Sequence, residues 1–217
     1  MKVSKKLAVL FLALCLLLAV SGCRKLGQIA DAVDAKPFSI GTVEGNRYVN
    51  DFISLQCELD DEWDIYTHEQ LAQLSGVVSD MFTDEEVREL VEDSSSVFVY
   101  YAENLQTYAS VNITVSNTES YGAALTDHDE LVDAISEQMP EMLAQSYMED
   151  IVCKPDTFSF CGEDEYGIYI SATAYGLPMY ERQVIIVEGT YTIALTVCTY
   201  MEDTTMDLLK LFSSYEG

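Results

Sequence analysis

Apolar and polar residues alternate along several stretches of the chain between residues 39 and 199. In residues 52–59 every second position is apolar, namely Ile53, Leu55, Cys57 and Leu59. A period of two is typical of a strand with one buried face. Eight further stretches predict strands by alternation or by their β-branched and aromatic content, namely 39–44, 47–50, 97–101, 110–116, 156–160, 166–175, 180–188 and 190–199.

Short turns join several of these predicted strands. Gly45-Asn46 separates the first two, and Glu188-Gly189 gives the clearest hairpin turn of the chain. Strands joined by such short turns must run antiparallel. Residues 184–187 are apolar throughout and residues 168–174 nearly so, which predicts that both faces of the sheet's centre are covered.

Helical patterns interrupt the strands. Residues 67–70 (Thr-His-Glu-Gln) and 83–86 (Thr-Asp-Glu-Glu) fit the capping box, in which side chains satisfy free backbone amides at a helix start. A third helix is predicted from residues 126–129, and Pro140 should kink or restart it. A short helix is predicted over residues 204–212. The predicted fold class is therefore α+β, a central antiparallel sheet with helices on both faces in an α/β/α sandwich.

The first 22 residues have the organisation of a secretory signal peptide. Three lysines and no acid precede residues 7–20, which are apolar throughout. A helix of that length spans about 21 Å, less than the roughly 30 Å of a bilayer core, so a cleaved signal is expected. Residues 20–23 (Val-Ser-Gly-Cys) resemble the lipobox of bacterial lipoproteins, which implies that Cys23 is acylated and begins the mature protein.

This resemblance predicts an extracytoplasmic bacterial protein anchored to the membrane by lipid on Cys23. A tether at 23–36 and a single domain at 37–217 are expected to follow the signal. After residue 22 the chain carries 37 acidic and eight basic residues, a formal charge of −29. That charge excludes nucleic acid as a partner and disfavours an anionic bilayer surface. Lipid, rather than charge, is therefore expected to hold the protein at the membrane.

Two motifs in the predicted domain resemble the PsbP-like fold. Residues 45–52 (Gly-Asn-Arg-Tyr-Val-Asn-Asp-Phe) lead to residues 57–63 (Cys-Glu-Leu-Asp-Asp-Glu-Trp), followed at once by a predicted helix. In small bacterial lipoproteins of this fold, a G-x-x-Y-x-N-x-x stretch and an l-p-x-x-W stretch stand at about this spacing. The carboxyl-terminal part of the chain also resembles this fold, since it has a predicted strand bearing Gly167, two long strands and a final helix. The chain departs from the family pattern at Leu59-Asp60, where a Pro is common.

The resemblance implies the same α/β/α sandwich and favours a protein partner. The fold is shared by the PsbP subunit of photosystem II and a Ran-binding nuclear import factor, and its well-known members act by docking on larger complexes. It implies no catalytic residue for this chain. Because folds do not fix function, the partner is an analogy at the level of the fold.

The sequence carries no catalytic signature. Its two histidines, His68 and His128, lie in the first turns of predicted helices, where they should face water. The acidic runs at 60–64 and 163–165 lack the alternating spacing of a calcium loop and are interpreted as solvated turns. No enzyme activity, cofactor or metal site is predicted. A carboxylate pair among 37 acids cannot be picked out by inspection, so a hydrolase stays open as an alternative.

Aromatic side chains give the candidate binding surface. Tyr169 and Tyr175 share one face of a predicted strand, where exposed rings could stack on sugars or anchor a partner, although packing beneath a helix also fits them. Trp63, the single Trp, is included in this candidate surface. Alternatively, its ring packs in the core where a predicted strand meets a predicted helix.

Four cysteines lie in the predicted domain, and an exported protein can form disulfides. Cys153 and Cys161 are close enough in sequence for a disulfide to link neighbouring segments, and this pair is the candidate disulfide. Cys57 and Cys198 fit strand positions, where a free cysteine behaves as a small buried hydrophobe.

Three functions are consistent with these observations. The leading hypothesis is a lipid-anchored, non-catalytic cell-envelope protein that acts as a protein-binding or assembly module. The second is a surface lipoprotein that binds a small ligand or a glycan, and the third is a cell-envelope hydrolase.

Overall fold

The computed structural model describes residues 36–77, 82–93, 96–118 and 127–216. The predicted signal peptide, Cys23 and the tether up to residue 35 lie outside the described residues. Among the described residues, no helix is both long and apolar enough to span a membrane.

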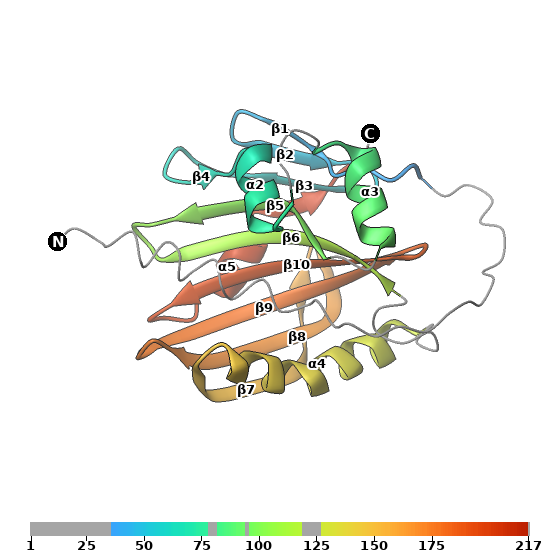
Figure 1. The fold of residues 1–217 in the computed structure, drawn as a ribbon. Coiled ribbons are helices and arrows are strands. Elements are labelled where there is room, and N and C mark those ends of the chain that lie inside the picture. The colour runs from blue at the N-terminus through green and yellow to red at the C-terminus, as the bar shows by residue number, and fades with distance from the viewer. Residues whose placement is uncertain (1–35, 78–81, 94–95, 119–126, 217) are drawn as a thin grey trace.

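A seven-stranded antiparallel sheet forms the centre of the molecule (Figure 1). Its strand order is β4-β5-β6-β10-β9-β8-β7, so long hairpins in the second half of the chain build one side. The bounds are β4 Asp64–Ile65, β5 Val97–Asn104, β6 Ala109–Asn117, β7 Met148–Phe160, β8 Glu163–Ala174, β9 Leu177–Glu188 and β10 Tyr191–Tyr200.

Helix α4, His128–Gln145, covers one face of this sheet at the β7–β9 side (Figure 1). Because side chains of a strand alternate between faces, every second residue of β8 points toward α4. Ile168, Ile170, Ala172 and Ala174 pack there against apolar residues of the helix. The helix runs through Pro140 without interruption, so the predicted restart at that residue is wrong.

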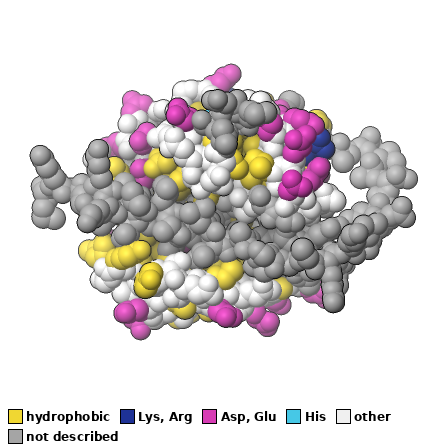
Figure 2. Space-filling model, in the orientation of Figure 1, with side chains coloured by type: hydrophobic (Ala, Val, Ile, Leu, Met, Phe, Trp, Pro, Cys, Tyr) yellow, Lys and Arg dark blue, Asp and Glu magenta, His cyan; other side chains and the backbone are white. Residues whose placement is uncertain are grey.

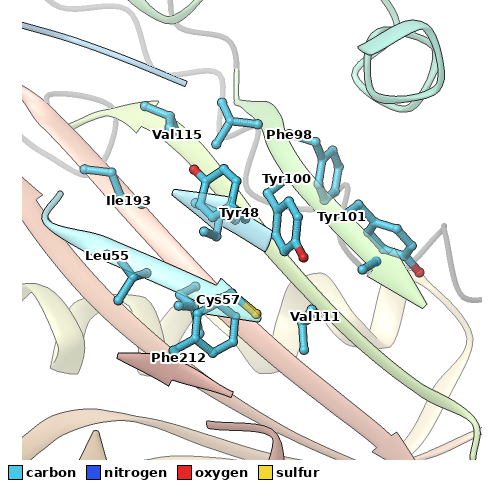
Figure 3. Packing of buried hydrophobic residues seen from close by; sticks show 14 of the residues in the cluster. Tyr48, Leu55, Cys57, Phe98, Tyr100, Tyr101, Val111, Val115, Ile193 and Phe212 are labelled. Atoms are coloured by element: carbon cyan, nitrogen blue, oxygen red, sulfur yellow. The ribbon is translucent and has the colours of Figure 1, made fainter. Parts of the chain in front are cut away.

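The opposite face is covered by a second, four-stranded sheet of order β1-β2-β3-β11 and by the short helix α5. The bounds are β1 Thr42–Glu44, β2 Arg47–Asn50, β3 Leu55–Glu58, β11 Phe212–Ser214 and α5 Thr205–Leu209. Tyr48 of the small sheet stacks on Tyr100 of the large one, with ring centroids 4.4 Å apart, and Cys57 lies beside the pair (Figure 3). The hydroxyl of Tyr48 donates a hydrogen bond to the carbonyl of Ile40.

Both predicted capping boxes are confirmed. Thr67 caps α2, His68–Leu74, and Thr83 caps α3, Asp84–Glu92; in each case the backbone N–H of the Thr also donates to the side chain at the third helical position. These helices lie along the β5 and β6 side of the large sheet.

The predicted α+β class, with an antiparallel sheet and helices on both of its faces, is confirmed, but three further local predictions are wrong. Residues 51–54 form a turn before β3 rather than the start of a strand, and Ser54 has a positive φ. The predicted helix at 204–212 ends at Leu209, and Phe212 begins β11. His128 is only half-exposed, since its Nε2 lies 2.9 Å from the carbonyl oxygen of Ile185.

Candidate functional site

The structure does not bring the predicted aromatic surface together. Trp63 precedes β4, at one edge of the large sheet, and is partly buried against the core. Tyr169 lies in β8, five strand spacings away, or about 24 Å at roughly 4.8 Å per strand. Tyr175 follows the end of β8, about 20 Å from Tyr169 at roughly 3.3 Å per residue. The three rings therefore cannot contact one ligand.

The predicted bridge between Cys153 and Cys161 is not formed, and both thiols are free. Cys153 lies within β7 and Cys161 directly after its last residue, so an extended strand separates them by about 26 Å. A disulfide requires Cα atoms within about 7 Å. Burial raises the pKa of the Cys153 thiol to about 12, which leaves it protonated and unreactive at neutral pH.

One end of the large sheet carries an unusual set of exposed side chains. Of the seven large hydrophobic residues that are exposed in the described chain, four lie in or next to the connections at this end: Leu105, Tyr147, Tyr175 and Met201. Their exposed fractions are 47, 84, 50 and 57% respectively. We call these four residues the apolar rim.

Sheet topology places the apolar rim at a single end. Leu105 follows β5, Tyr147 precedes β7, Tyr175 follows β8 and Met201 follows β10, and antiparallel pairing brings these strand ends together. Across the strand order the rim extends from the β5 end to the β7 edge, about 24 Å at roughly 4.8 Å per strand. Figure 2 shows hydrophobic side chains gathered at this end, at the left edge of the molecule.

The backbone of the rim is as unusual as its exposure. Tyr147, Tyr175 and Met201 have φ values of 62, 54 and 74°, in the left-handed region that favours glycine. A left-handed conformation costs an ordinary L-residue about 1–2 kcal/mol, and Asn tolerates it better than bulky residues do. Tyr175 and Gly176 both have positive φ, as the type I′ turn of a two-residue hairpin requires, and Asn-Gly is the preferred pair there. Three bulky side chains thus occupy positions where Gly or Asn would fold at lower cost.

The charged residues next to the rim in the sequence are acidic, and one of them, Asp203, forms a 3.0 Å ion pair with Arg182 of β9. Glu149 and Asp150 follow Tyr147, and Glu202 and Asp203 follow Met201, and all four acids are exposed. The rim segments 103–109, 146–151, 174–178 and 200–204 contain no Lys or Arg. An apolar surface with an acidic border is therefore the chemical character of this end.

Two carboxylates are buried within strands of the large sheet. Burial raises the pKa of Glu181 to about 7, and the Gln183 side-chain amide donates a 2.6 Å hydrogen bond to its Oε1. Glu103 has a pKa that is also raised by burial. The register Glu103, Ser110, Cys198, Glu181 puts their backbones about 14 Å apart at roughly 4.8 Å per strand. The carboxyl groups of a glycosidase pair lie roughly 5–10 Å apart, whereas Ser110 and Cys198 of two intervening strands lie between Glu103 and Glu181.

Comparison with known proteins adds no identity. No protein-family model matches the chain, and no curated protein is significantly similar to it. Within the part of the chain that the structure describes, no group of three or more His, Cys, Asp or Glu side chains could hold a metal ion.

The sequence did not point to the rim, except at Tyr175. Exposure in a turn has no periodicity, so alternation could not mark Leu105, Tyr147 or Met201. The one local signal was a bulky residue before Gly176, in the place where a hairpin favours Asn.

Proposed function

We propose that this protein is a lipid-anchored, non-catalytic module of the bacterial cell envelope that binds a partner protein through the apolar rim. The observation that carries the proposal is the placement of Tyr147, Tyr175 and Met201 in left-handed turns while their side chains face solvent. Bulky residues in strained backbone positions cluster at functional sites, where the surrounding structure holds them in place despite their cost to folding.

The chemistry of the rim favours a protein over a lipid surface. Tyr and Met are enriched at protein interfaces, where a Tyr ring buries apolar area and its hydroxyl finds a polar partner. The acidic border at Glu149, Asp150, Glu202 and Asp203 repels an anionic bilayer. The same border complements basic residues around the contact surface of a partner protein. The partner surface should therefore be apolar at its centre and basic at its border.

A glycan-binding or small-ligand receptor is the second candidate. A sugar platform needs rings that lie side by side, and the distances separating Trp63, Tyr169 and Tyr175 give it less support than the rim gives to protein docking. A hydrolase is supported least, because two intervening strands separate the backbones of the two buried carboxylates.

The proposal is tested by cross-linking on intact cells followed by purification of the full-length protein. The wild type should capture one dominant, near-stoichiometric envelope protein. A triple variant, Tyr147→Asn, Tyr175→Asn and Met201→Asn, should capture at least about tenfold less, because interface anchors are worth roughly 2 kcal/mol or more each. Since Asn tolerates the left-handed region, the triple variant should melt at or above the wild-type temperature.

Matched controls make the outcome decisive. A double variant, Val43→Thr and Val187→Thr, removes exposed apolar residues outside the rim and should capture the partner as the wild type does. Undiminished capture by a folded triple variant would refute docking through the rim. Binding of the unacylated Cys23→Ala protein to phosphatidylglycerol vesicles, lost in the triple variant, would show instead that the rim inserts into lipid.

A further inference from the structure

Helix α4 lies at one margin of the large sheet, where it packs mainly on β7, β8 and β9 (Figure 1). Its exposed side carries acids four residues apart, at Asp129, Asp133, Glu137 and Glu141, and the helix contains no Lys or Arg. Like charges at this spacing are neighbours on the helix surface and destabilise it. The helix therefore depends on its contacts with the sheet.

Glu181 of β9 lies within the surface on which α4 packs. Its cross-strand neighbours, Ile170 of β8 and Cys198 of β10, both belong to the apolar cluster that these strands form with α4. Only 5% of Glu181 is exposed, and its Oε1 accepts a hydrogen bond from the side-chain amide of Gln183. An ionised carboxylate in this place would lose most of its hydration.

No cation faces Glu181 to offset a negative charge. Among the described residues, no Lys, Arg or His lies within ion-pair distance of its carboxylate. The six buried residues of α4 are uncharged, and Ser136 is the polar one among them. The titratable groups that face Glu181 from other strands are the thiols of Cys153 in β7 and Cys198 in β10. Burial without a cation raises the pKa of Glu181 to about 7.

A second titratable contact fastens the first turn of α4. The Nε2 of His128 lies 2.9 Å from the carbonyl oxygen of Ile185 in β9 and 3.4 Å from Glu165 of β8, and its Nδ1 lies 3.2 Å from Asp129. Burial lowers the pKa of His128, but the bonds to Asp129 and Ile185 and the charge of Glu165 outweigh burial and raise the pKa overall. The neutral ring keeps one N–H and loses its attraction to the two carboxylates.

Both groups act in the same direction as the pH rises. At acidic pH Glu181 is neutral and His128 is charged, and both states favour the docked helix. As the pH rises through their pKa values in the docked state, this stabilisation is lost. Glu181 then places a negative charge beneath a helix that is itself acidic, and His128 no longer attracts Glu165.

We infer that α4 is a pH-sensitive element of the fold, docked firmly on the large sheet at acidic pH and released more readily when Glu181 ionises, with His128 reinforcing the change. The opposite face of the large sheet keeps its own core, since β5, β6 and β10 pack there against the small sheet. Release of α4 therefore leaves the contact between the two sheets in place. The inference requires no partner at the apolar rim, so it is tested independently of the proposed docking function.

Two cysteines on opposite faces of the large sheet report on this release. Cys198 belongs to the cluster beneath α4, whereas Cys57 is buried between the two sheets, and neither is in a disulfide. Full-length protein in detergent is labelled with a maleimide at about pH 5.5 and about pH 8. Each rate is divided by the rate of the same cysteine in urea-unfolded protein at the same pH.

Normalised labelling of Cys198 should rise about thirtyfold between the two pH values. This factor follows from a Glu181 pKa of about 7 in the docked state and about 4.3 in the released, solvated state. Cys57 should be labelled at least about tenfold more slowly than Cys198 at the higher pH, because a local opening requires less free energy than unfolding of the whole domain.

Variants identify the cause of the rise. Glu181→Gln keeps the shape of the protonated acid and should reduce the rise to less than about threefold, the part left to the half-exposed His128. The matched control, Tyr166→Phe, removes a 2.8 Å hydrogen bond from Tyr166 to Asp133 of α4. It should speed labelling of Cys198 about fivefold at both pH values, as expected for one net hydrogen bond, and leave the rise unchanged.

Three results would overturn the inference. They are labelling of Cys198 that does not rise with pH in the wild type, a full rise that persists in Glu181→Gln, and labelling of Cys57 as fast as that of Cys198. The last result would show that α4 opens only when the whole domain unfolds.

Discussion

Glu181 shows how a single residue can determine the pH dependence of stability. Its carboxyl is buried, and its only neighbouring donor among the hydrogen bonds of the described chain is the amide of Gln183. Burial raises the pKa of Glu181 in the folded protein to about 7. In the unfolded chain a Glu carboxyl loses its proton near a pKa of about 4.3. The folded state thus binds one proton more than the unfolded state between these two values.

We expect Glu181→Gln to flatten the pH profile of stability. The stabilisation that the Glu181 proton supplies is complete below about pH 4.3 and is lost as the pH rises to about 7, a fall of roughly 3 kcal/mol. Gln mimics the protonated acid, so the variant should match the wild type near pH 4.5 and exceed it at pH 8. Urea unfolding across this range measures the difference.

The matched control for this prediction is Glu202→Gln, because Glu202 is an exposed acid. Its pH profile should run parallel to that of the wild type. A parallel profile for Glu181→Gln as well would show that the acid does not keep its proton in the folded state.

Three residues of the apolar rim have side chains that do not suit their local backbone conformation. Tyr175 stands where a hairpin favours Asn, and Tyr147 and Met201 stand in the same left-handed region. Sequences usually agree with their local structure, and the exceptions are expected at functional sites. This reasoning gives the rim more weight than exposure alone would, since single exposed hydrophobic residues are common.

At the scale of the element, the three long hairpin strands depend on one close approach of backbone. A Cβ on Gly167 of β8 would lie 2.4 Å from the carbonyl oxygen of Gln183 in β9 and 2.7 Å from the ring of Phe158 in β7. The first of these atoms belongs to backbone and cannot rotate away. Gly167 is therefore required by the spacing of strands rather than by a turn.

Gly167→Ala should lower the free energy of unfolding by about 2–3 kcal/mol, because overpacking of a dense core forces the backbone to shift. Chemical denaturation of the variant measures this loss. Ser171→Ala, on the same face of the same strand but half-buried, should cost less than about 1 kcal/mol and serves as the comparison. Equal stability of the two variants would mean that the strands separate easily at Gly167.

Elements with a local cause were the ones predicted well. The capping boxes at Thr67 and Thr83 placed two helices, and the hairpin at Glu188-Gly189 placed β9 and β10. By contrast, β11 is only three residues long and exists because Phe212 pairs with Cys57, which is far away in the sequence. A short strand of this kind has no periodicity of its own to detect.

For the whole molecule, the net negative charge explains why a lipid anchor is proposed. The chain has 37 acidic and 11 basic residues, so an anionic membrane surface repels it and lipid on Cys23 is proposed to hold it in place. In the proposed arrangement, this repulsion keeps the body of the protein off the head groups and leaves the apolar rim accessible to the proposed partner.

Cys23→Ala should move the protein from the membrane to the soluble fraction or leave it as an unprocessed precursor. Two acyl chains give stable anchoring, and neither can be attached without the thiol. Cell fractionation and the mass of the purified protein provide the measurement, with Cys198→Ala as a control that keeps the lipobox. Wild-type fractionation together with wild-type mass in Cys23→Ala would contradict the lipobox interpretation.

The α+β class, the antiparallel hairpins and the helix starts could be predicted from the sequence, because alternation, turn residues and caps act over a few neighbouring positions. Contacts between distant residues follow from the packing of the folded chain. It separated Trp63 from Tyr169, kept Cys153 and Cys161 apart on one extended strand, and added a second sheet over Tyr100. It also gathered Leu105, Tyr147, Tyr175 and Met201 at one end, since strand order across a sheet is set by packing between distant segments.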